Sequence, residues 1–452
     1  MRRWLLLFLL AAPALATPSR AAESAAPDTS STLSLHAAVD RALGQYPSIG
    51  AARAAADEAR AAQGEALAAR VPGVRVSAAG TRSDEPSIVS PIHAFDPRTF
   101  PPFNETVLTG SATLSYTLFD GGARGGRIDR ARALARSSEV SLDDASQTLV
   151  WRVIRNYVDV VARRRVLDAH DRRLEALRSE RSRILQRFEV GRAAEVDRLR
   201  IEAALASAEA DQVQASIALD AAERDLARFI GGTQRDAAAS RLVPVALADS
   251  AVGARESLRA QALERSTALA RARYQAAAAD AGADAARGAR WPQLRLTGTY
   301  AYYADPEGYH ADDWSGALAL SYDVFTGGAT TNAIRRADAS RGAAREQLRQ
   351  ATVDLEHDLD RALALHRESR ARVASLGIAV TRYAEVARIQ GLLLESGAGT
   401  QTDYLNAQAD LLTARASLST ARADQIAARA EIARVVGTLD LDWIDRNLER
   451  EP

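Results

Sequence analysis

An internal repeat constrains this chain more than any other feature, because it means that one structural plan is used twice. The stretch FDGGA at 119–123 recurs as FTGGA at 325–329, and this shift of 206 residues holds downstream to Gly231 and Gly437. Upstream of the glycines the shift becomes 220, which matches Pro72 to Pro292. The 14-residue difference therefore lies in one loop of the first copy. The sequence predicts two copies of one folding unit.

Each copy is expected to hold a helical segment, two strands, a very long helix and a shorter helix. For the first repeat, 33–231, we predict a helical segment at about 33–70, strands at about 74–82 and 106–119, and helices at about 122–190 and 193–231. For the second, 252–437, we predict a helical segment at about 252–290, strands at about 294–303 and 314–325, and helices at about 328–396 and 399–437. Residues 232–251 and 438–452 are expected to form an equatorial linker and an equatorial tail.

The strands are predicted from alternation of apolar and polar residues. Leu114, Tyr116 and Leu118 alternate with threonine and serine, and the other three segments follow the same pattern. Segments of about 10 residues suit tilted membrane strands, although a strand of a soluble sandwich alternates in the same way. Four strands between such long helices have no second sheet to cover them. Lipid does not tolerate open strand edges, and small barrels need about eight strands or more. The sequence therefore predicts a membrane β-barrel that other copies of the chain complete.

The helices are predicted from composition and spacing. Alanine is abundant, and alanine, arginine, glutamate and leucine are strong helix formers. Val153, Val160, Leu167 and Leu174 lie seven residues apart, which is typical of helices packed side by side. A helix of about 69 residues is roughly 100 Å long. One long helix beside two stacked shorter ones, twice over, would make a wall four helices wide. A solid coiled-coil bundle is the alternative, and the many charged residues on each helix favour a water-filled tube.

The composition excludes several classes of function. Fifty-eight acidic residues balance 58 arginines, so no net positive charge would attract nucleic acid. The absence of cysteine excludes disulfides, thiolate chemistry and an acylated cysteine. The paired glycines resemble a phosphate loop, but the chain has no lysine to complete one. We find no catalytic triad, metal-ligand spacing or paired catalytic carboxylates, and we predict a protein that is not an enzyme and needs no cofactor.

The first 22 residues read as a signal peptide. Arg2 and Arg3 precede an apolar run over 4–12, and an Ala-Leu-Ala stretch at 14–16 offers small residues for cleavage. The apolar run is too short to cross roughly 30 Å of hydrocarbon as an anchor. General secretion is expected, with a twin-arginine route as the alternative.

Several motifs together resemble the TolC-like outer-membrane efflux protein family, also called outer membrane factors. They are an opening helix at 35–42 followed by Tyr-Pro, the LFDGG turn at 118–122, and the tip segment GTQTDYLNAQ at 399–408. The resemblance implies a homotrimer with a twelve-stranded barrel in the outer membrane of a Gram-negative bacterium and a twelve-helix tube in the periplasm. It also implies an inner-membrane transporter that delivers substrate through a periplasmic adaptor protein, so that this chain is the exit duct of a tripartite efflux system.

The resemblance also indicates where a pore gate would lie. Asp403 lies six residues past a tip glycine, where family members carry a ring of aspartates, and like charges around one axis would favour cations in the constriction. Asn406 occupies the position of a second ring, which is uncharged here, and Asp197 is the equivalent of Asp403 in the first repeat. A helix N-terminal acid stabilised by the helix dipole is the structural alternative for both aspartates.

Two further sets of residues are expected to shape turns. Gly191 and Gly397, with Arg192 and Gly399 beside them, would form the tips on which an adaptor docks, although Arg192 is equally compatible with a solvated turn. The strand-to-helix turns are expected at paired glycines that adopt positive φ, namely Gly121, Gly122, Gly327 and Gly328.

Two other functions remain open at this stage. One is the exit duct of a type I protein secretion system, because the inner-membrane partner largely decides the substrate. The other is a periplasmic coiled-coil scaffold without a pore, which would be extracted without detergent.

Overall fold

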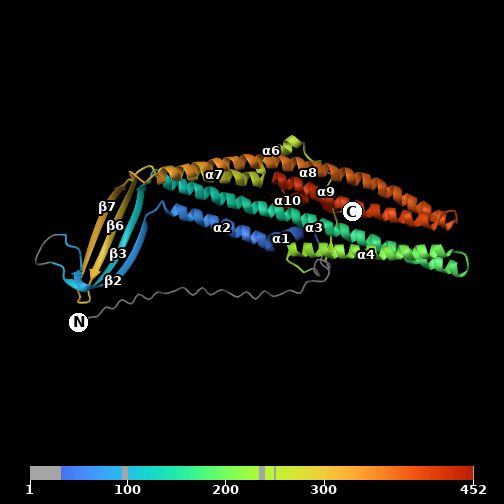
Figure 1. Cartoon of the computed structure of the whole chain (residues 1–452), viewed down its shortest axis with the longest axis horizontal. Coiled ribbons are helices and arrows are strands. Elements are labelled where there is room, and N and C mark those ends of the chain that lie inside the picture. The colour runs from blue at the N-terminus through green and yellow to red at the C-terminus, as the bar shows by residue number, and fades with distance from the viewer. Residues whose placement is uncertain (1–31, 94–99, 234–239, 249–250, 451–452) are drawn as a thin grey trace.

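The computed structural model describes residues 32–93, 100–233, 240–248 and 251–450. The expected signal peptide lies outside these residues. The molecule is elongated, with a four-stranded sheet at one end and helices running from the sheet to two hairpin tips at the other end (Figure 1).

Two pairs of long and short helices make up most of the molecule. The long helices are α3, Ala123–Glu189, and α8, Ala329–Glu395, with 67 residues each. The short helices are α4, Glu195–Ile230, and α9, Gln401–Val436, with 36 residues each. At 1.5 Å per residue the long helices reach roughly 100 Å. No described helix combines the length and the apolar character needed to cross a lipid bilayer.

The helical segment that precedes the sheet in each repeat consists of two helices, whereas we predicted one helical segment at 33–70 and one at 252–290. In the first repeat α1, Leu35–Gln45, ends at Tyr46, and α2, Pro47–Ala68, begins with a proline. Proline suits the first position of a helix but cannot continue one, which explains this break. In the second repeat α6, Arg255–Arg265, and α7, Thr267–Gly288, are separated by Ser266.

The helices lie side by side in a single layer. Near the sheet the neighbours follow the order α2, α3, α7, α8, and toward the tips the order is α4, α3, α9, α8. Helices α3 and α8 therefore run the full length, while stacked shorter helices fill the places beside them (Figure 1). In both halves α8 lies at an edge of the layer.

The sheet has the order β2-β3-β6-β7 with antiparallel neighbours throughout. Its strands are β2, Gly73–Ile88, β3, Phe103–Phe119, β6, Gln293–Ala304, and β7, His310–Ser321. The two hairpins have the same register: Val74 lies opposite Leu114, and their repeat equivalents Leu294 and Leu320 also lie opposite each other.

Two strands differ from their expected bounds by four residues or more, and the strand expected at 106–119 begins three residues earlier, at Phe103. The strand expected at 74–82 continues to Ile88, because the β2–β3 ladder resumes after a register shift between Arg82 and Ser87. The strand expected at 314–325 lies at 310–321 instead. It ends at Ser321 because its neighbour β6 begins at Gln293, the partner of Ser321, and offers no ladder partner beyond it.

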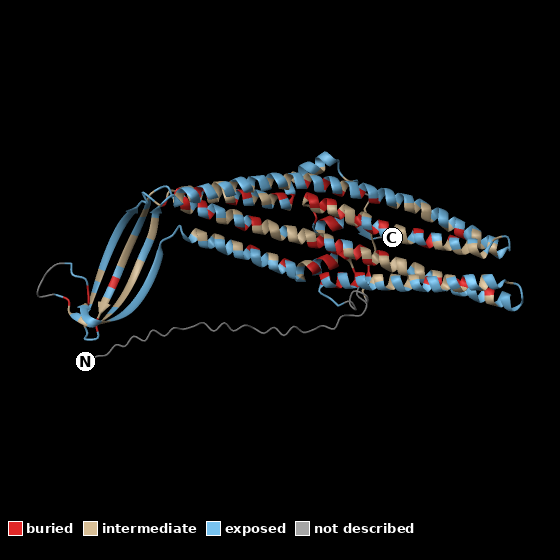
Figure 2. Ribbon diagram, in the orientation of Figure 1, coloured by how far each residue is buried: buried red, intermediate tan, exposed pale blue. Residues whose placement is uncertain are grey.

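The main hydrophobic core lies halfway along the molecule, where Figure 2 shows the densest band of buried residues. Here two small sheets and a short helix cover α1, α3 and α4. They are β1, Thr32–Leu33, with β4, Arg241–Leu242; β5, Val245–Leu247, with β8, Leu448–Arg450; and α10, Leu441–Asn447.

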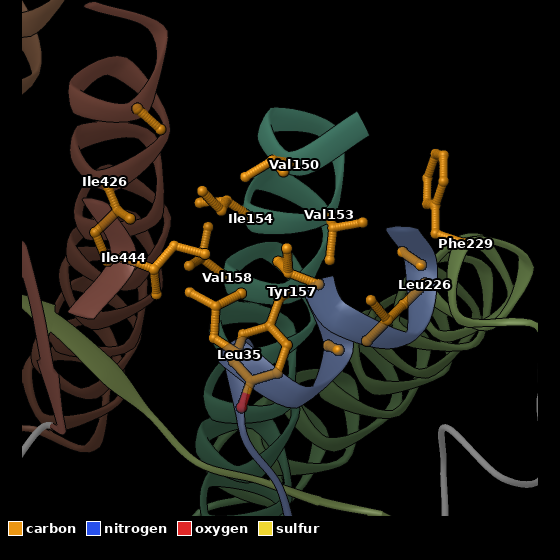
Figure 3. Packing of buried hydrophobic residues seen from close by; sticks show 14 of the residues in the cluster. Leu35, Val150, Val153, Ile154, Tyr157, Val158, Leu226, Phe229, Ile426 and Ile444 are labelled. Carbon is orange, nitrogen blue, oxygen red and sulfur yellow. The ribbon is translucent and has the colours of Figure 1, made fainter. Parts of the chain in front are cut away.

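Tyr157 lies at the centre of this core and is completely buried (Figure 3). Its hydroxyl lies 2.7 Å from the carbonyl oxygen of Leu33 and 2.9 Å from that of Val243. Burial raises the pKa of Tyr157 to about 12. The phenol therefore stays protonated at neutral pH and can donate to these carbonyls, which belong to the two chain segments that form the β1–β4 pair.

Candidate functional site

Both hairpin tips use the same backbone device to reverse the chain. Gly191 and Gly397 have φ of 70° and 78°, in the left-handed region that favours glycine. At the first tip, the amides of Gly191 and Arg192 donate to the carbonyls of Phe188 and Arg187. This pattern is a Schellman motif, which satisfies the last carbonyls of a helix. The exposed side chain of Arg192 takes no part in it.

The second tip repeats the motif and adds a close contact. The amide of Gly397 donates to the carbonyl of Leu394, and those of Ala398 and Gly399 both donate to that of Leu393. A Cβ on Gly399 would lie 2.9 Å from the Cβ of Leu393, so even alanine would force the turn to shift. The sequence predicted the tip at Gly399 but not this reason for a glycine there.

Asp403 lies in the first turn of α9 and takes part in its N-terminal cap. Thr400 is the N-cap: its Oγ1 accepts from the amide of Asp403 at 3.1 Å and donates to Oδ2 of Asp403 at 2.6 Å. One oxygen of this exposed carboxylate is thus engaged within the tip. Asn406 lies one turn further along the same helix and is also exposed.

Asp197 has the corresponding place in the first turn of α4. Its Oδ2 accepts from the amide of Ala194 at 3.4 Å, and its own amide donates to the carbonyl of Ala194 at 3.0 Å. Ala194, unlike Thr400, has no side-chain oxygen, so this cap is weaker. The two aspartates lie on separate tips at the same end of the molecule (Figure 1).

The strand-to-helix turns are built on four glycines with positive φ. The angles are 64° and 87° in the first repeat and 61° and 86° in the second, at Gly121, Gly122, Gly327 and Gly328. Gly121 is also tightly packed, because a Cβ there would lie 2.5 Å from the carbonyl oxygen of Gly288. The paired glycines join strands to helices and hold no phosphate-binding lysine.

Asp120 is a structural residue that the sequence analysis missed. It is buried, and its Oδ2 accepts from the amide of Arg124 at 2.6 Å and from Nη2 of Arg127 at 3.1 Å. It therefore stabilises the start of α3, which has no side-chain cap at Gly122 itself. An aspartate just before the start of a helix is the sequence signal for this role, since its carboxylate can accept from an amide of the first turn.

Within the described residues no group of three or more histidine, aspartate or glutamate side chains is arranged to hold a metal ion. The tips and turns combine backbone reversal and helix capping with aspartates that are exposed at 403, half-buried at 197 and buried at 120. These features shape the two ends of the helical layer and place acidic side chains there.

Comparison with known proteins identifies the family. The model of the outer membrane efflux protein family matches residues 38–232 and 258–438. The chain belongs to this family. Family membership places the chain in the outer membrane, from which it extends into the periplasm. The two matched segments each hold one copy of the repeat. No curated protein sequence matches this chain.

Several solved structures share the fold of this efflux-family chain. The CmeC outer membrane channel of Campylobacter jejuni has a TM-score of 0.76 at 16% identity, with 91% of this chain and 88% of that chain covered. A membrane protein from Pseudomonas aeruginosa has a TM-score of 0.75 at 22% identity, with 89% and 93% covered. VceC from Vibrio cholerae has a TM-score of 0.73 at 18% identity, with 89% and 96% covered. At these identities the similarity establishes the mainly helical fold.

Proposed function

We propose that this chain forms a homotrimeric channel that exports substrates across the periplasm and the outer membrane. In this proposal the trimer is the exit duct of a tripartite efflux system, and an inner-membrane transporter feeds it through a periplasmic adaptor. Family membership supports an efflux duct, and the structures of CmeC and MtrE are both described as outer membrane channels. One observation supports the assembly of several copies. The two repeats contact each other inside the chain, and the repeat equivalents of the contacting elements lie at the two edges of the molecule.

In the sheet, β3 of the first repeat pairs with β6 of the second. The equivalent pair is β7 with β2, and these are the two edge strands of the sheet. Repeating the β3–β6 contact between copies would pair β7 of one chain with β2 of the next. Three chains would then close a ring of twelve strands and leave no open edge, as a membrane requires.

The helical layer shows the same relation. Leu405 of α9 and Leu177 of α3 belong to the same apolar cluster, which joins the two repeats near the tips. Their repeat equivalents, Leu199 of α4 and Tyr383 of α8, are 52% and 40% exposed. Since α4 and α8 are the edge helices here, the same contact between copies would cover both side chains and close the tube.

Engineered disulfides test the ring, because the chain has no cysteine of its own. Thr113 lies opposite Thr299 in the β3–β6 ladder. Their equivalents are Ala319 of β7 and Ala79 of β2, so an Ala79→Cys/Ala319→Cys variant should form disulfides between chains. Directly opposed strand residues lie about 4.5–5.5 Å apart at Cα, within reach of a disulfide.

The matched control moves one cysteine by two residues along β7. Ala79→Cys/Ala317→Cys keeps the same face of the strand but takes the Cα atoms beyond the roughly 7 Å limit for a disulfide. We expect a covalent trimer for the first pair on a non-reducing gel and monomers for the second. Monomers for both pairs in outer-membrane extracts would contradict the ring.

For the gate, we propose that Asp403, with Asn406 one turn further on and Asp197 on the neighbouring tip, lines the narrowest point of the closed channel. The exposed carboxylate of Asp403 and the half-buried one of Asp197, both at the tips, support this assignment. Asp403→Ala should raise the single-channel current and weaken cation preference, because it removes a ring of like charges. Thr400→Val is the control that removes the cap and keeps the charge. If both variants behave alike, Asp403 acts only as a capping residue.

We further propose that the tips at Gly191, Arg192, Gly397 and Gly399 form the surface on which the adaptor docks. A susceptibility panel with drugs and metals on a deletion strain, beside a comparison of secreted proteins, separates efflux from type I protein secretion. Extraction without detergent and no current in planar bilayers would instead indicate a scaffold without a pore.

A further inference from the structure

A large cavity lies beside the central core, among α3, α8, α9 and the segment that follows β5. Its volume is about 990 Å³. One wall comes from residues 245–248 and 251–253, and the others come from the long and short helices. The tips, the strand-to-helix turns and the proposed gate all lie elsewhere in the chain.

The described part of the lining is rich in arginine. It includes six arginines, namely Arg165, Arg255, Arg367, Arg370, Arg422 and Arg429. Asp360 is the only acidic residue among the described residues of the lining, and it is engaged by Arg255 through two hydrogen bonds of 2.6 and 2.9 Å. The chain as a whole is neutral, so the gathering of these arginines in one lining comes from the fold.

A histidine with an unused ring nitrogen lies in the same lining. His366 is only 8% exposed, and its Nδ1 is buried without a hydrogen-bond partner among the described residues. Burial lowers the pKa of His366, and the nearby positive charges of Arg429 and Arg370 lower it further. The ring is therefore neutral at pH 7. A buried polar atom without a partner has a free-energy cost, and a ligand that supplies a partner would remove it.

The cavity also has an apolar part. Val158 of α3, Leu363 of α8 and Ile426 of α9 lie in the lining beside the arginines. Binding sites for small molecules typically combine apolar walls with a few polar groups that fix the orientation. Guanidinium groups match carboxylate and phosphate oxygens in geometry as well as charge.

We propose that this cavity binds a soluble amphipathic anion, a small molecule that joins a carboxylate or phosphate to an apolar body. The anionic group lies against Arg367 and Arg370 of α8, beside the buried His366 of the same helix. The apolar body lies against the valine, leucine and isoleucine side chains. This site lies away from the tips and the proposed gate, so its failure would leave the proposed channel intact.

Calorimetric titration of the purified full-length protein with hexyl phosphate, inorganic phosphate and hexanol tests the site. We expect hexyl phosphate to bind most tightly, because it alone supplies both the charge and the apolar chain. Loss of a charge-assisted hydrogen bond costs about 1.5–3 kcal/mol, so the Arg367→Gln/Arg370→Gln variant should bind hexyl phosphate at least about tenfold more weakly. Both arginines are exposed, so the variant should keep its fold.

Arg181→Gln is the matched control, since Arg181 is an exposed arginine of α3 outside the lining. It should bind hexyl phosphate as the natural chain does. Equal binding by all three proteins, or no binding of hexyl phosphate above that seen with detergent alone, would overturn the proposal. Equal binding of hexanol and hexyl phosphate would likewise remove the anionic site, while unchanged thermal unfolding shows that the variants are folded.

Discussion

The first helix of each repeat packs against its long helix in two chemically opposite ways. In the first repeat Leu35 of α1 and Ile154 of α3 lie in the same buried core. Their repeat equivalents are Arg255 of α6 and Asp360 of α8, which form an ion pair of 2.6 Å. One turn further along, Val39 and Val150 are replaced in the same way by Arg259 and Glu356, which also form an ion pair.

The difference follows from what covers each helix. Helix α1 lies under α10 and the small sheets, so water is excluded and apolar packing is favourable. Helix α6 has no such cover and stands out from the layer (Figure 1). Hydrogen bonding by Arg255 lowers the pKa of Asp360 and keeps it charged. A duplicated backbone thus tolerates either chemistry, and the surroundings decide which one is stable.

The largest effect should come from the apolar side of this comparison. Ile154 is completely buried, so Ile154→Ala removes apolar contacts and leaves a cavity. We expect the free energy of unfolding to fall by about 2–4 kcal/mol, measured by urea denaturation. Asp360→Ala at the equivalent position is the control and should change stability much less, because exposed ion pairs are weak. Equal losses in the two variants would break the comparison.

A smaller loss is expected when only a buried hydrogen bond is removed from the first-repeat core. Tyr157→Phe keeps the ring but removes the hydroxyl that donates to the carbonyls of Leu33 and Val243, so the Leu33 carbonyl keeps only its 3.3 Å bond from the Val243 amide. The free energy of unfolding should fall by about 1–2 kcal/mol in the same urea experiment. No loss would mean that water replaces the phenol and that this core is less dry than its burial indicates.

A pH effect should come from His366 in the second repeat, in addition to that of His170 in the first, whose pKa is also lowered by burial. His366 is the equivalent of Val160, and its pKa is lowered by burial and by Arg429 and Arg370. The unfolded chain takes up the proton near pH 6.5, before the folded chain does, so stability is lost as the pH falls from about 6.5 through the lower folded pKa. Thermal unfolding between pH 7.5 and 5 should show a shallower decline in His366→Gln. Parallel curves would remove this assignment.

The smallest effect concerns a pair whose polarity is reversed between the repeats. Arg60 of α2 pairs with Glu139 of α3 at 2.8 Å, and the equivalent pair is Asp280 of α7 with Arg345 of α8 at 2.9 Å. Arg60→Asp should lower the melting temperature slightly at low salt, because it places two acids together. Arg60→Asp/Glu139→Arg should restore it, and 1 M salt should remove the difference. No recovery in the double variant would show that the pair is not exchangeable.

The sequence predicts the helices and strands of this molecule well, but it predicts poorly the sites where residues from distant segments come together. The mainly helical fold is confirmed, and the long helices begin and end within a residue or two of their expected bounds, because glycines mark both ends. The resemblance indicated the end of the first helix before Tyr46, whereas the equivalent break at Ser266 was not expected, since helix formers continue on both sides of it. The position of the gate stays a prediction.

The arginines of the cavity could not be predicted to lie together from the sequence. Arg165, Arg370 and Arg429 are far apart in a chain where charges of both signs are evenly spread. Only the packing of α3, α8 and α9 brings them together. The role of Asp120 was not predicted, because the glycines that follow it indicate a turn but not which side chain accepts from the first amides of α3.

The contrast in burial between the two ends of the molecule has a consequence for biogenesis. The helices have a core of their own, whereas in the four described strands of the large sheet Ala301 is the only buried residue. A newly exported chain can therefore complete its helical body before its sheet has any stable surroundings. If the chain assembles as proposed, the edges of β2 and β7 stay open to misassembly until other copies cover them.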